Sequence, residues 1–371
     1  MHIALFCHSL LSDWNHGNAH FLRGVCSELA ERGHRVRVFE PCDAWSARNL
    51  AADYGEAALG AVFAVYPALD IVRYDEATLD LDAALDGADL VLVHEWNTHS
   101  LVRRIGEHRA AAGRYILLFH DTHHRSVSDA DAMAAYDLDA YDGVLAFGEV
   151  VRDRYVRAGW AKRAWSWHEA ADIRVFRPLP AIAPGRDVVW IGNWGDDERS
   201  AELREFLIDP VRRLRLTADV HGVRYPDAAI AQLRAANIEF QGWTPNFRVP
   251  KLFAAHRVTI HVPRRPYTKR LPGIPTIRPF EALACGIPLV SAPWDDVDGL
   301  FTAGEDYLVA ADGEAMTRAL RDVLADRALA RALAEHGRQT IESRHTCAHR
   351  VDELLSIARS LAPVRQTVEA L

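Results

Sequence analysis

Short, continuous apolar segments alternate with longer segments of helical periodicity along most of the chain, and this alternation constrains the fold more than any other feature. Residues 2–9 (HIALFCHS) are largely apolar, residues 19–33 form an amphipathic helical pattern that ends at Gly33, and residues 34–40 (HRVRVFE) are again strand-like. Together they predict a βαβ unit. Strands without polar alternation need cover on both faces, so they indicate a parallel sheet between two layers of helices.

The same pattern predicts two successive series of strands. The first series is residues 2–9, 34–40, 69–74, 88–96, 114–121 and 142–151, and the second is residues 187–194, 216–222, 238–243, 258–263, 287–294 and 306–312. Residues 174–187 lie between them and hold three prolines and a glycine, which predicts a linker. We therefore expect an α/β protein of two doubly wound, Rossmann-like domains with a ligand cleft between them.

Composition and charge exclude several classes of protein and partner. Of the 371 residues, 49% are hydrophobic and 25% are charged, a balance typical of globular proteins and not of disordered chains. The net charge of −8 predicts no general affinity for nucleic acid. Five widely spaced cysteines without a CxxC pair argue against structural zinc and fit a reducing compartment. No signal peptide and no apolar segment of ~18 residues is evident, so we expect a cytoplasmic protein without membrane insertion.

The polar loop after the first strand, residues 9–20, is the first candidate site. Ligands of open α/β sheets bind at the carboxyl ends of strands, where this loop lies. Gly17 allows close backbone approach, the next helix offers its first N–H groups, and His16, Asn18 and His20 add side-chain donors. The loop lacks the GxGxxG pattern of dinucleotide sites. The alternative is a helix cap with solvated polar residues.

A second candidate is the segment LLFHDTHH (117–124), where a strand brings His120 and Asp121 to the same edge of the sheet. Such a pair suits proton transfer or an ordered hydrogen-bond network. His123 and His124 follow, but no recognised ligand spacing supports a metal. Ordinary loop polarity is the alternative.

The most specific pattern is residues 273–290 (GIPTIRPFEALACGIPLV). A proline-rich loop leads into a helix whose N-terminus favours phosphate, with Thr276 at its start. Arg278 offers a planar fork to the same anion. Glu281 lies within an apolar helix, where a carboxylate needs partners such as ribose hydroxyls. The alternative is a surface-facing Glu281.

Over nearly its full length the chain resembles the GT-B glycosyltransferases, and among them the CgeB-like (spore-maturation-protein-like) branch. The motifs that carry the resemblance are residues 17–41, 191–203, 221–226, 261–266, 275–291 and 335–354. The resemblance implies a glycosyltransferase, a hexosyltransferase in the simplest case, that moves a sugar from a nucleoside-diphosphate sugar to an unidentified acceptor. It implies an acceptor domain over residues 1–180, with residues 346–371 packing back on it, and a donor domain over residues 185–345.

The resemblance also implies residue roles. Glu281 would hold the ribose, and Arg278 or Thr276 the diphosphate. The remaining residues expected along the donor cleft are Gly192, Asn193, Arg199, His221, Gly222 and Arg264. No metal and no cofactor are expected, because arginines and helix N-termini would neutralise the departing diphosphate. A sugar-nucleotide epimerase of related fold and a nucleotide-sugar-binding protein without turnover are the alternatives.

One departure leaves the stereochemistry open. Many retaining GT-B enzymes carry two glutamates eight residues apart; Glu281 can be the second, but position 273 is glycine. An inverting enzyme would need a base beside the acceptor, and the N-terminal domain offers His16, His20, His120 and Asp121. We rank Asp121 and His20 first. The alternative is that these side chains only bind the acceptor or cap the helix.

Overall fold

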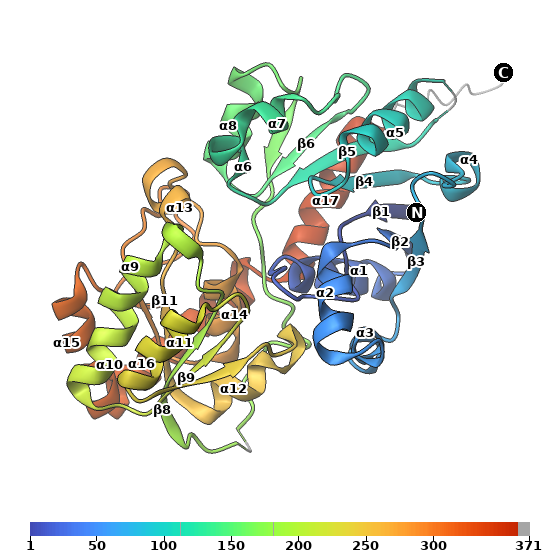
Figure 1. Ribbon diagram of the computed structural model, residues 1–371. Coiled ribbons are helices and arrows are strands. Elements are labelled where there is room, and N and C mark those ends of the chain that lie inside the picture. Colours follow the sequence, from blue (N-terminus) through green and yellow to red (C-terminus); the bar gives the residue numbers. More distant parts are fainter. Residues whose placement is uncertain (112, 181, 363–371) are drawn as a thin grey trace.

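The structure is a computed structural model and describes residues 1–111, 113–180 and 182–362. The strands of these residues form two sheets (Figure 1). The first sheet contains β1 (His2–Phe6), β2 (Arg35–Pro41), β3 (Asp70–Tyr74), β4 (Leu90–His94), β5 (Ile116–Asp121), β6 (Gly143–Ala146) and β7 (Ala164–Ser166). The second contains β8 (Arg186–Ile191), β9 (Ala218–His221), β10 (Ile238–Gly242), β11 (His256–His261), β12 (Leu289–Ser291) and β13 (Leu308–Val309). We call residues 1–180 the N-terminal half and residues 182–345 the C-terminal half.

Both sheets are doubly wound. The strand order is β3-β2-β1-β4-β5-β6-β7 in the first and β10-β9-β8-β11-β12-β13 in the second, and the described strand pairs are parallel. The order reverses between β1 and β4 and between β8 and β11, and ligands of such folds bind beyond the carboxyl ends of the strands at these points. The predicted class, an α/β protein with two Rossmann-like sheets, is confirmed.

Helices cover the sheets. Those of the N-terminal half are α1 (Ala19–Glu31), α2 (Trp45–Tyr54), α3 (Ala57–Gly60), α4 (Leu81–Ala84), α5 (His99–Ala111), α6 (Arg125–Ser128), α7 (Ala130–Ala134) and α8 (Glu149–Arg157). Those that follow are α9 (Ser200–Leu203), α10 (Asp209–Leu214), α11 (Asp227–Ala235), α12 (Val249–Ala255), α13 (Arg265–Arg270), α14 (Ile277–Cys285), α15 (Gly313–Ala325), α16 (Arg327–Arg344) and α17 (Cys347–Leu361). None of the described helices is both long and apolar enough to cross a membrane.

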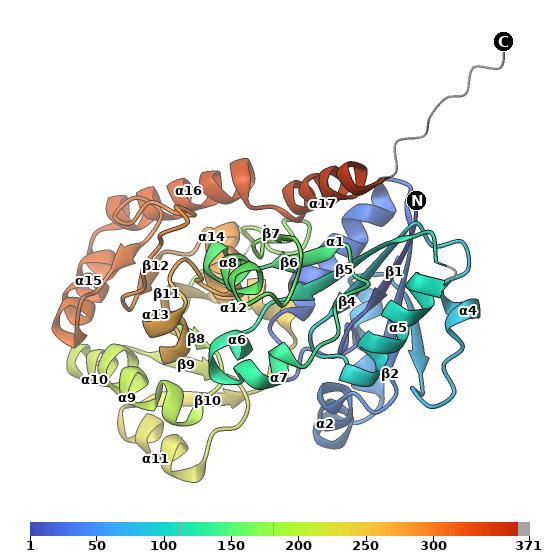
Figure 2. The same ribbon diagram turned by 90° about the horizontal axis from the view of Figure 1, so that it is seen from above.

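The last helix returns from the C-terminal half to the N-terminal half. Figure 2 shows α16 over the C-terminal half and α17 beside α1. Thr346 caps α17 in a capping box with His349, and Arg32 of α1 donates to Asp352 (2.5 Å). One apolar core contains Phe21 of α1, Leu354 of α17 and Phe280 of α14. The two halves therefore share buried apolar surface as well as a chain connection.

Two details of the strand prediction are wrong. The predicted strand 142–151 ends at Ala146, and Glu149 begins α8, with its N–H donated to Asp298 Oδ2 (3.0 Å). An apolar segment does not show by itself where a strand stops and a helix starts, because both bury apolar side chains. The three-residue β7 was not predicted, since residues 164–166 are too few to produce a pattern.

Candidate active site

A cleft of about 670 Å³ lies between the two halves, a volume typical of small-ligand sites. Its walls come from loops at the carboxyl ends of strands in both sheets and from the starts of α1 and α14. The predicted site residues that line it are His16, Gly17, Asn18, Gly192, Asn193, Arg199, His221, Gly222, Arg264, Thr276 and Arg278. The structure thus brings together residues from five separate segments, because parallel strands present their carboxyl ends at a common edge.

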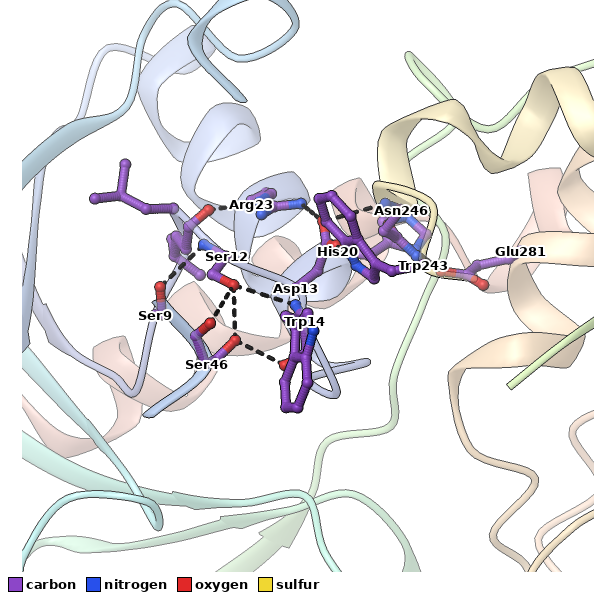
Figure 3. Close-up of polar contacts among 12 residues, drawn as sticks. Ser9, Ser12, Asp13, Trp14, His20, Arg23, Ser46, Trp243, Asn246 and Glu281 are labelled. Carbon is purple, nitrogen blue, oxygen red and sulfur yellow. Dashed lines mark hydrogen bonds and ion pairs between the residues drawn. The ribbon is translucent and has the colours of Figure 1, made fainter. Parts of the chain in front are cut away.

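The loop after β1 is held by buried hydrogen bonds (Figure 3). Ser12 Oγ donates to the carbonyl of Ser46, and Ser46 Oγ lies 2.8 Å from Ser12 Oγ. Arg23 of α1 is fully buried, and its Nε donates to the carbonyl of Leu10 (2.8 Å). These contacts give the loop a defined path to His16 at the cleft.

Asp13, in the same loop, joins the two halves. Its carboxylate accepts hydrogen bonds from Arg23 Nη1 (2.7 Å), Trp243 Nε1 (3.1 Å) and the N–H of Asn246 (3.1 Å). Arg23 belongs to the N-terminal half, and Trp243 and Asn246 belong to the C-terminal half. Figure 3 shows this carboxylate between the two sides. The start of the N-terminal loop is therefore fixed relative to the opposite wall.

The C-terminal wall begins with the loops after β8 and β9. A Cβ atom at Gly222 would collide with the carbonyl oxygen of Gly192, so glycine is required where these two loops cross. His221 Nδ1 lies 2.8 Å from Thr244 Oγ1. Burial lowers the pKa of His221 to about 4, which leaves its imidazole neutral at pH 7.

Three of the arginines that line the cleft, Arg199, Arg264 and Arg278, lie among acidic side chains of the same lining. Arg199 stacks over Trp190, with its Cζ 5.1 Å from the ring centroid, and donates to the carbonyl of Asn193 (2.5 Å). Arg264 donates to Glu198 Oε2 (2.5 Å), and Arg278 lies at the start of α14. Burial, followed by the charge of Arg264, lowers the pKa of Arg199. An anion in the cleft would offset this repulsion between guanidinium groups.

The N-terminus of α14 opens into the same space. Thr276 is its N-cap residue and has a φ of 63°, an unfavourable conformation for a residue with a Cβ. Its side chain makes no capping hydrogen bond. The first N–H groups of the helix are therefore available to a ligand, and the helix dipole favours an anion there.

Glu281 is fully buried and charged, so the interpretation of a surface-facing residue is excluded. Its Oε1 lies 2.8 Å from His20 Nδ1 and accepts from Asn246 Nδ2 (2.6 Å), and Arg278 contacts Oε2. Burial alone would raise the pKa of Glu281, but Arg278 and then His20 and Asn246 outweigh burial and hold the pKa below its ordinary value. The carboxylate lies behind Arg278 and Asn246, which line the cleft.

The structure does not place three of the four predicted bases in the cleft. His20 is fully buried, its Nδ1 faces Glu281, and its Nε2 accepts from the N–H of Asp172 (3.0 Å). Both nitrogens are therefore occupied, and His20 positions Glu281 instead of facing an acceptor. A helix residue can point toward solvent or toward a neighbouring helix, and here the contact with α14 decided the direction.

His120 and Asp121 lie beneath the cleft wall. His120 is enclosed by Phe21 and Trp167, and burial lowers its pKa to about 3. Asp121 is fully buried, accepts from Tyr155 Oη (2.9 Å) and from the N–H of His123 (3.0 Å), and burial raises its pKa to about 6. The side chains that reach the cleft from this strand end belong to Thr122, His123 and His124.

His16 is the predicted base that lines the cleft. It is 5% exposed, and burial followed by the charge of His8 holds its pKa well below the ordinary value. Gly17 also lines the cleft, but a Cβ there would meet Ile277 at an ordinary 3.5 Å. Gly17 precedes α1 and Ile277 begins α14, so the starts of these two helices lie close together at this point of the cleft.

Gly273, at the position of the missing glutamate, cannot carry a larger side chain. Its φ is 89°, and an added Cβ would collide with Asp298 Oδ1. Asp296 accepts the N–H groups of Leu300 (3.0 Å) and Phe301 (2.8 Å), as expected for a loop-forming residue. Within residues 1–111, 113–180 and 182–362, no group of three His, Cys, Asp or Glu side chains is arranged to hold a metal ion.

Several cleft residues were not predicted. They are Asp13, Trp45, Trp96, Glu169, Trp243, Thr244 and Asn246. Most lie in loops that carry no motif. Glu169 follows β7, which was itself missed.

Comparison with known proteins agrees with this geometry. Residues 199–356 match the sequence profile of a family described as glycosyl transferase-like. No curated protein sequence matches the chain significantly. A sucrose-phosphate synthase from Thermosynechococcus elongatus superimposes with a TM-score of 0.68 at 15% identity, over 97% of this chain and 99% of that chain.

Two further structures have similar folds. HepE from Anabaena, in complex with UDP and glucose, gives a TM-score of 0.67 at 15% identity, over 97% of this chain and 99% of that one. An alpha-glucosyltransferase, in complex with UDP and a 13-mer DNA, gives a TM-score of 0.70 at 11% identity, over 97% of this chain and 100% of that one. The chain therefore has the GT-B fold of nucleotide-sugar-dependent glycosyltransferases, with its residues 199–356 similar to the glycosyl transferase-like family.

Proposed function

We propose that the chain is a glycosyltransferase that moves a sugar, a hexose in the simplest case, from a nucleoside-diphosphate sugar to an acceptor on the N-terminal wall of the cleft. The observation that carries this proposal is that Arg199, Arg264 and Arg278 line one cleft together with Thr276, the N-cap residue of α14. Guanidinium groups and helix N–H groups are the donors that suit a diphosphate. The order of the sequence motifs supports a place for the chain in the CgeB-like branch.

The proposed reaction is a single transfer of the sugar, and the residues of the cleft assist it in a few ways. The oxygen of the acceptor hydroxyl bonds to the anomeric carbon, and the hydroxyl proton passes to His16, the predicted base that lines the cleft. The bond from the anomeric carbon to the diphosphate breaks, and the diphosphate leaves with the electron pair. The three arginines and the first N–H groups of α14 stabilise the negative charge that develops on the leaving group. The two walls hold the reactants together. We propose that the arginines replace a metal in this role.

A binding experiment tests the diphosphate site. UDP is the first probe, because similar folds bind it, and uridine is the comparison. The replacement Arg264→Gln should lower the affinity for UDP by roughly 10–100-fold, because a hydrogen bond to a charged group contributes about 1.5–3 kcal/mol. The affinity for uridine should change much less. The adjacent Arg265→Gln is the matched control, because Arg265 pairs with Glu202 outside the cleft. Calorimetry measures the affinities of the wild type and of both variants for UDP and for uridine.

Turnover is the second measurement. Release of UDP from UDP-glucose in the presence of acceptor mixtures should continue with EDTA. Loss of turnover with EDTA and recovery with Mg²⁺ would contradict the metal-independent mechanism. Binding without any turnover would favour a nucleotide-sugar-binding protein, and sugar epimerisation would favour an epimerase. A wild-type protein that binds no nucleoside diphosphate would overturn the proposal.

A further inference from the structure

Glu169 is a carboxyl group of the N-terminal half that reaches the cleft and that the sequence motifs do not include. It is 5% exposed and lines the cleft together with Asn18 and Arg278. The starts of α1 and α14 meet beside it, as the 3.5 Å approach of Ile277 to the Cβ position of Gly17 indicates. Glu169 therefore lies where the two walls of the cleft come together.

The backbone that carries Glu169 is rigidly supported. Trp167 is fully buried, and its Nε1 donates to the carbonyl of Arg350 in α17 (2.8 Å). Ala171 donates its N–H to the carbonyl of His345 (2.9 Å) and accepts from the N–H of Cys347 (3.0 Å). The side chain thus projects from a segment that is fixed on both sides by the junction of α16 and α17.

Glu169 and Asn18 have unused hydrogen-bonding capacity. Asn18 Nδ2 donates to Glu169 Oε1 (3.1 Å). Within the part of the chain that the structure describes, Glu169 Oε2 has no hydrogen-bond partner, and neither does the buried Asn18 Oδ1. Polar atoms this deeply enclosed are usually paired. Glu169 Oε2 is therefore left for a ligand in the cleft, and the enclosed Asn18 Oδ1 beside it also lacks a partner among the described residues.

The charges around Glu169 distinguish between ligand groups. Burial raises the pKa of Glu169 to about 8; the hydrogen bond from Asn18 opposes this, Glu281 adds to it, and Arg278 opposes it. A position beside the carboxyl groups of Glu169 and Glu281 is unfavourable for a phosphate. A neutral carboxyl both donates and accepts, and this is what a hydroxyl group also does.

We propose that Glu169 and Asn18 bind hydroxyl groups of the sugar that is transferred. This assignment rests on the proposed function, because the sugar is placed next to the diphosphate that Arg278 and α14 would hold. Gly273 leaves no room for a glutamate at the motif position. Glu169 supplies a carboxyl group to the same cleft from the opposite half of the molecule.

The test compares a nucleotide with and without its sugar. Affinities for UDP and UDP-glucose are measured by calorimetry for the wild type, Glu169→Ala, Glu169→Gln and Asn18→Ala. Glu169→Ala should lower the affinity for UDP-glucose by about 10-fold, while the affinity for UDP changes little. Glu169→Gln should lose less affinity for UDP-glucose, because an amide also donates and accepts hydrogen bonds. Asp197→Asn, an exposed carboxyl at the cleft rim, is the control and should leave the difference between the two nucleotides unchanged.

The possible outcomes separate the two proposals. A loss confined to UDP-glucose supports the sugar-binding role of Glu169. Equal weakening of UDP and UDP-glucose, or no weakening of either, overturns that role while the glycosyltransferase proposal stands. A wild-type protein that binds neither nucleotide overturns both. A thermal-unfolding curve for each variant identifies any loss of folded protein, and the isosteric Glu169→Gln keeps the comparison usable if Glu169→Ala fails to fold.

Discussion

At the scale of single residues, Glu281 links the C-terminal wall of the cleft to the N-terminal half. Its carboxylate is fully buried between His20 of α1 and Asn246 and Arg278 of the C-terminal half. A buried charge is tolerated when its partners satisfy it, and removing one member leaves the others uncompensated. Glu281 lies behind Arg278 and Asn246, so it is a structural residue that positions these two side chains, and the structure does not bring the predicted ribose-binding carboxylate to the cleft surface.

Glu281→Gln should lower the free energy of unfolding by roughly 1–3 kcal/mol, because Arg278 and His20 lose their charged acceptor inside the protein. Urea denaturation followed by circular dichroism measures the change as a lower midpoint with an unchanged slope. Glu335→Gln removes an exposed pair with Arg331 on α16 and should leave the midpoint unchanged. Equal midpoints for the wild type and Glu281→Gln would contradict the role of this network.

At the scale of elements, the crossing of α1 and α17 depends on a small residue. A Cβ at Gly24 of α1 would lie 2.5 Å from Cys347 Sγ and 2.8 Å from Asp172 Cβ. Arg174 also donates to the carbonyl of Gly24 (2.7 Å). The last helix can reach the N-terminal half only because α1 leaves this space open.

Gly24→Ala should destabilise the protein by about 1–3 kcal/mol, since a methyl group forced into a packed contact displaces its neighbours. Gly60→Ala is the matched control, because Gly60 is helical and exposed and no atom lies within 4 Å of its Cβ position. That control should be neutral or stabilising by up to ~1 kcal/mol. Thermal unfolding compares the two variants, and similar melting points would show that α17 can shift to accept the methyl group.

At the scale of the whole molecule, polar contacts surround the cleft and connect the two halves. Besides Asp13 and Glu281, His168 Nε2 lies 2.8 Å from Asp298 Oδ2, and His124 Nε2 lies 3.7 Å from Glu198 Oε2. Histidine takes part in several of these contacts, and many histidines are buried. The stability of the assembled cleft should therefore depend on pH.

Acidification from pH 7 to pH 5 should lower the free energy of unfolding. Burial lowers the pKa values of histidines throughout the fold, namely His8, His16, His94, His120, His221, His261 and His345. Below pH 6.5 the unfolded chain binds protons at these groups while the folded chain does not, so stability falls by up to about 1.4 kcal/mol per pH unit for each proton.

Buried carboxyl groups act in the opposite direction. Burial raises the pKa values of Glu40, Glu95, Asp121 and Glu169, so the folded chain keeps protons there that the unfolded chain releases above pH 4.5. These groups are fewer than the histidines, and the net effect is a loss of stability with acid. Urea denaturation at pH 7.5, 6.0 and 5.0 measures it, and a midpoint that stays constant or rises toward pH 5 would contradict the prediction.

The sequence by itself determined the two parallel sheets and eleven of the residues that line the cleft. Gly192, His221 and Arg264 were expected from the resemblance to the GT-B glycosyltransferases, and the structure places them at or beyond the carboxyl ends of β8, β9 and β11, which meet at one edge of the sheet. Thr276 and Arg278 were found because a helix start is visible in the sequence. These inferences use short stretches of chain, where periodicity and turn residues carry the information.

Only the tertiary structure decided which of these side chains face the ligand. His20 could have pointed into the cleft, but it contacts Glu281, which is 261 positions away in sequence. Glu169 gave no local signal, and its place depends on the junction of α16 and α17 beneath it. Side-chain direction and burial at such positions are set by contacts between segments that are distant in the chain, and a local pattern contains no information about those contacts.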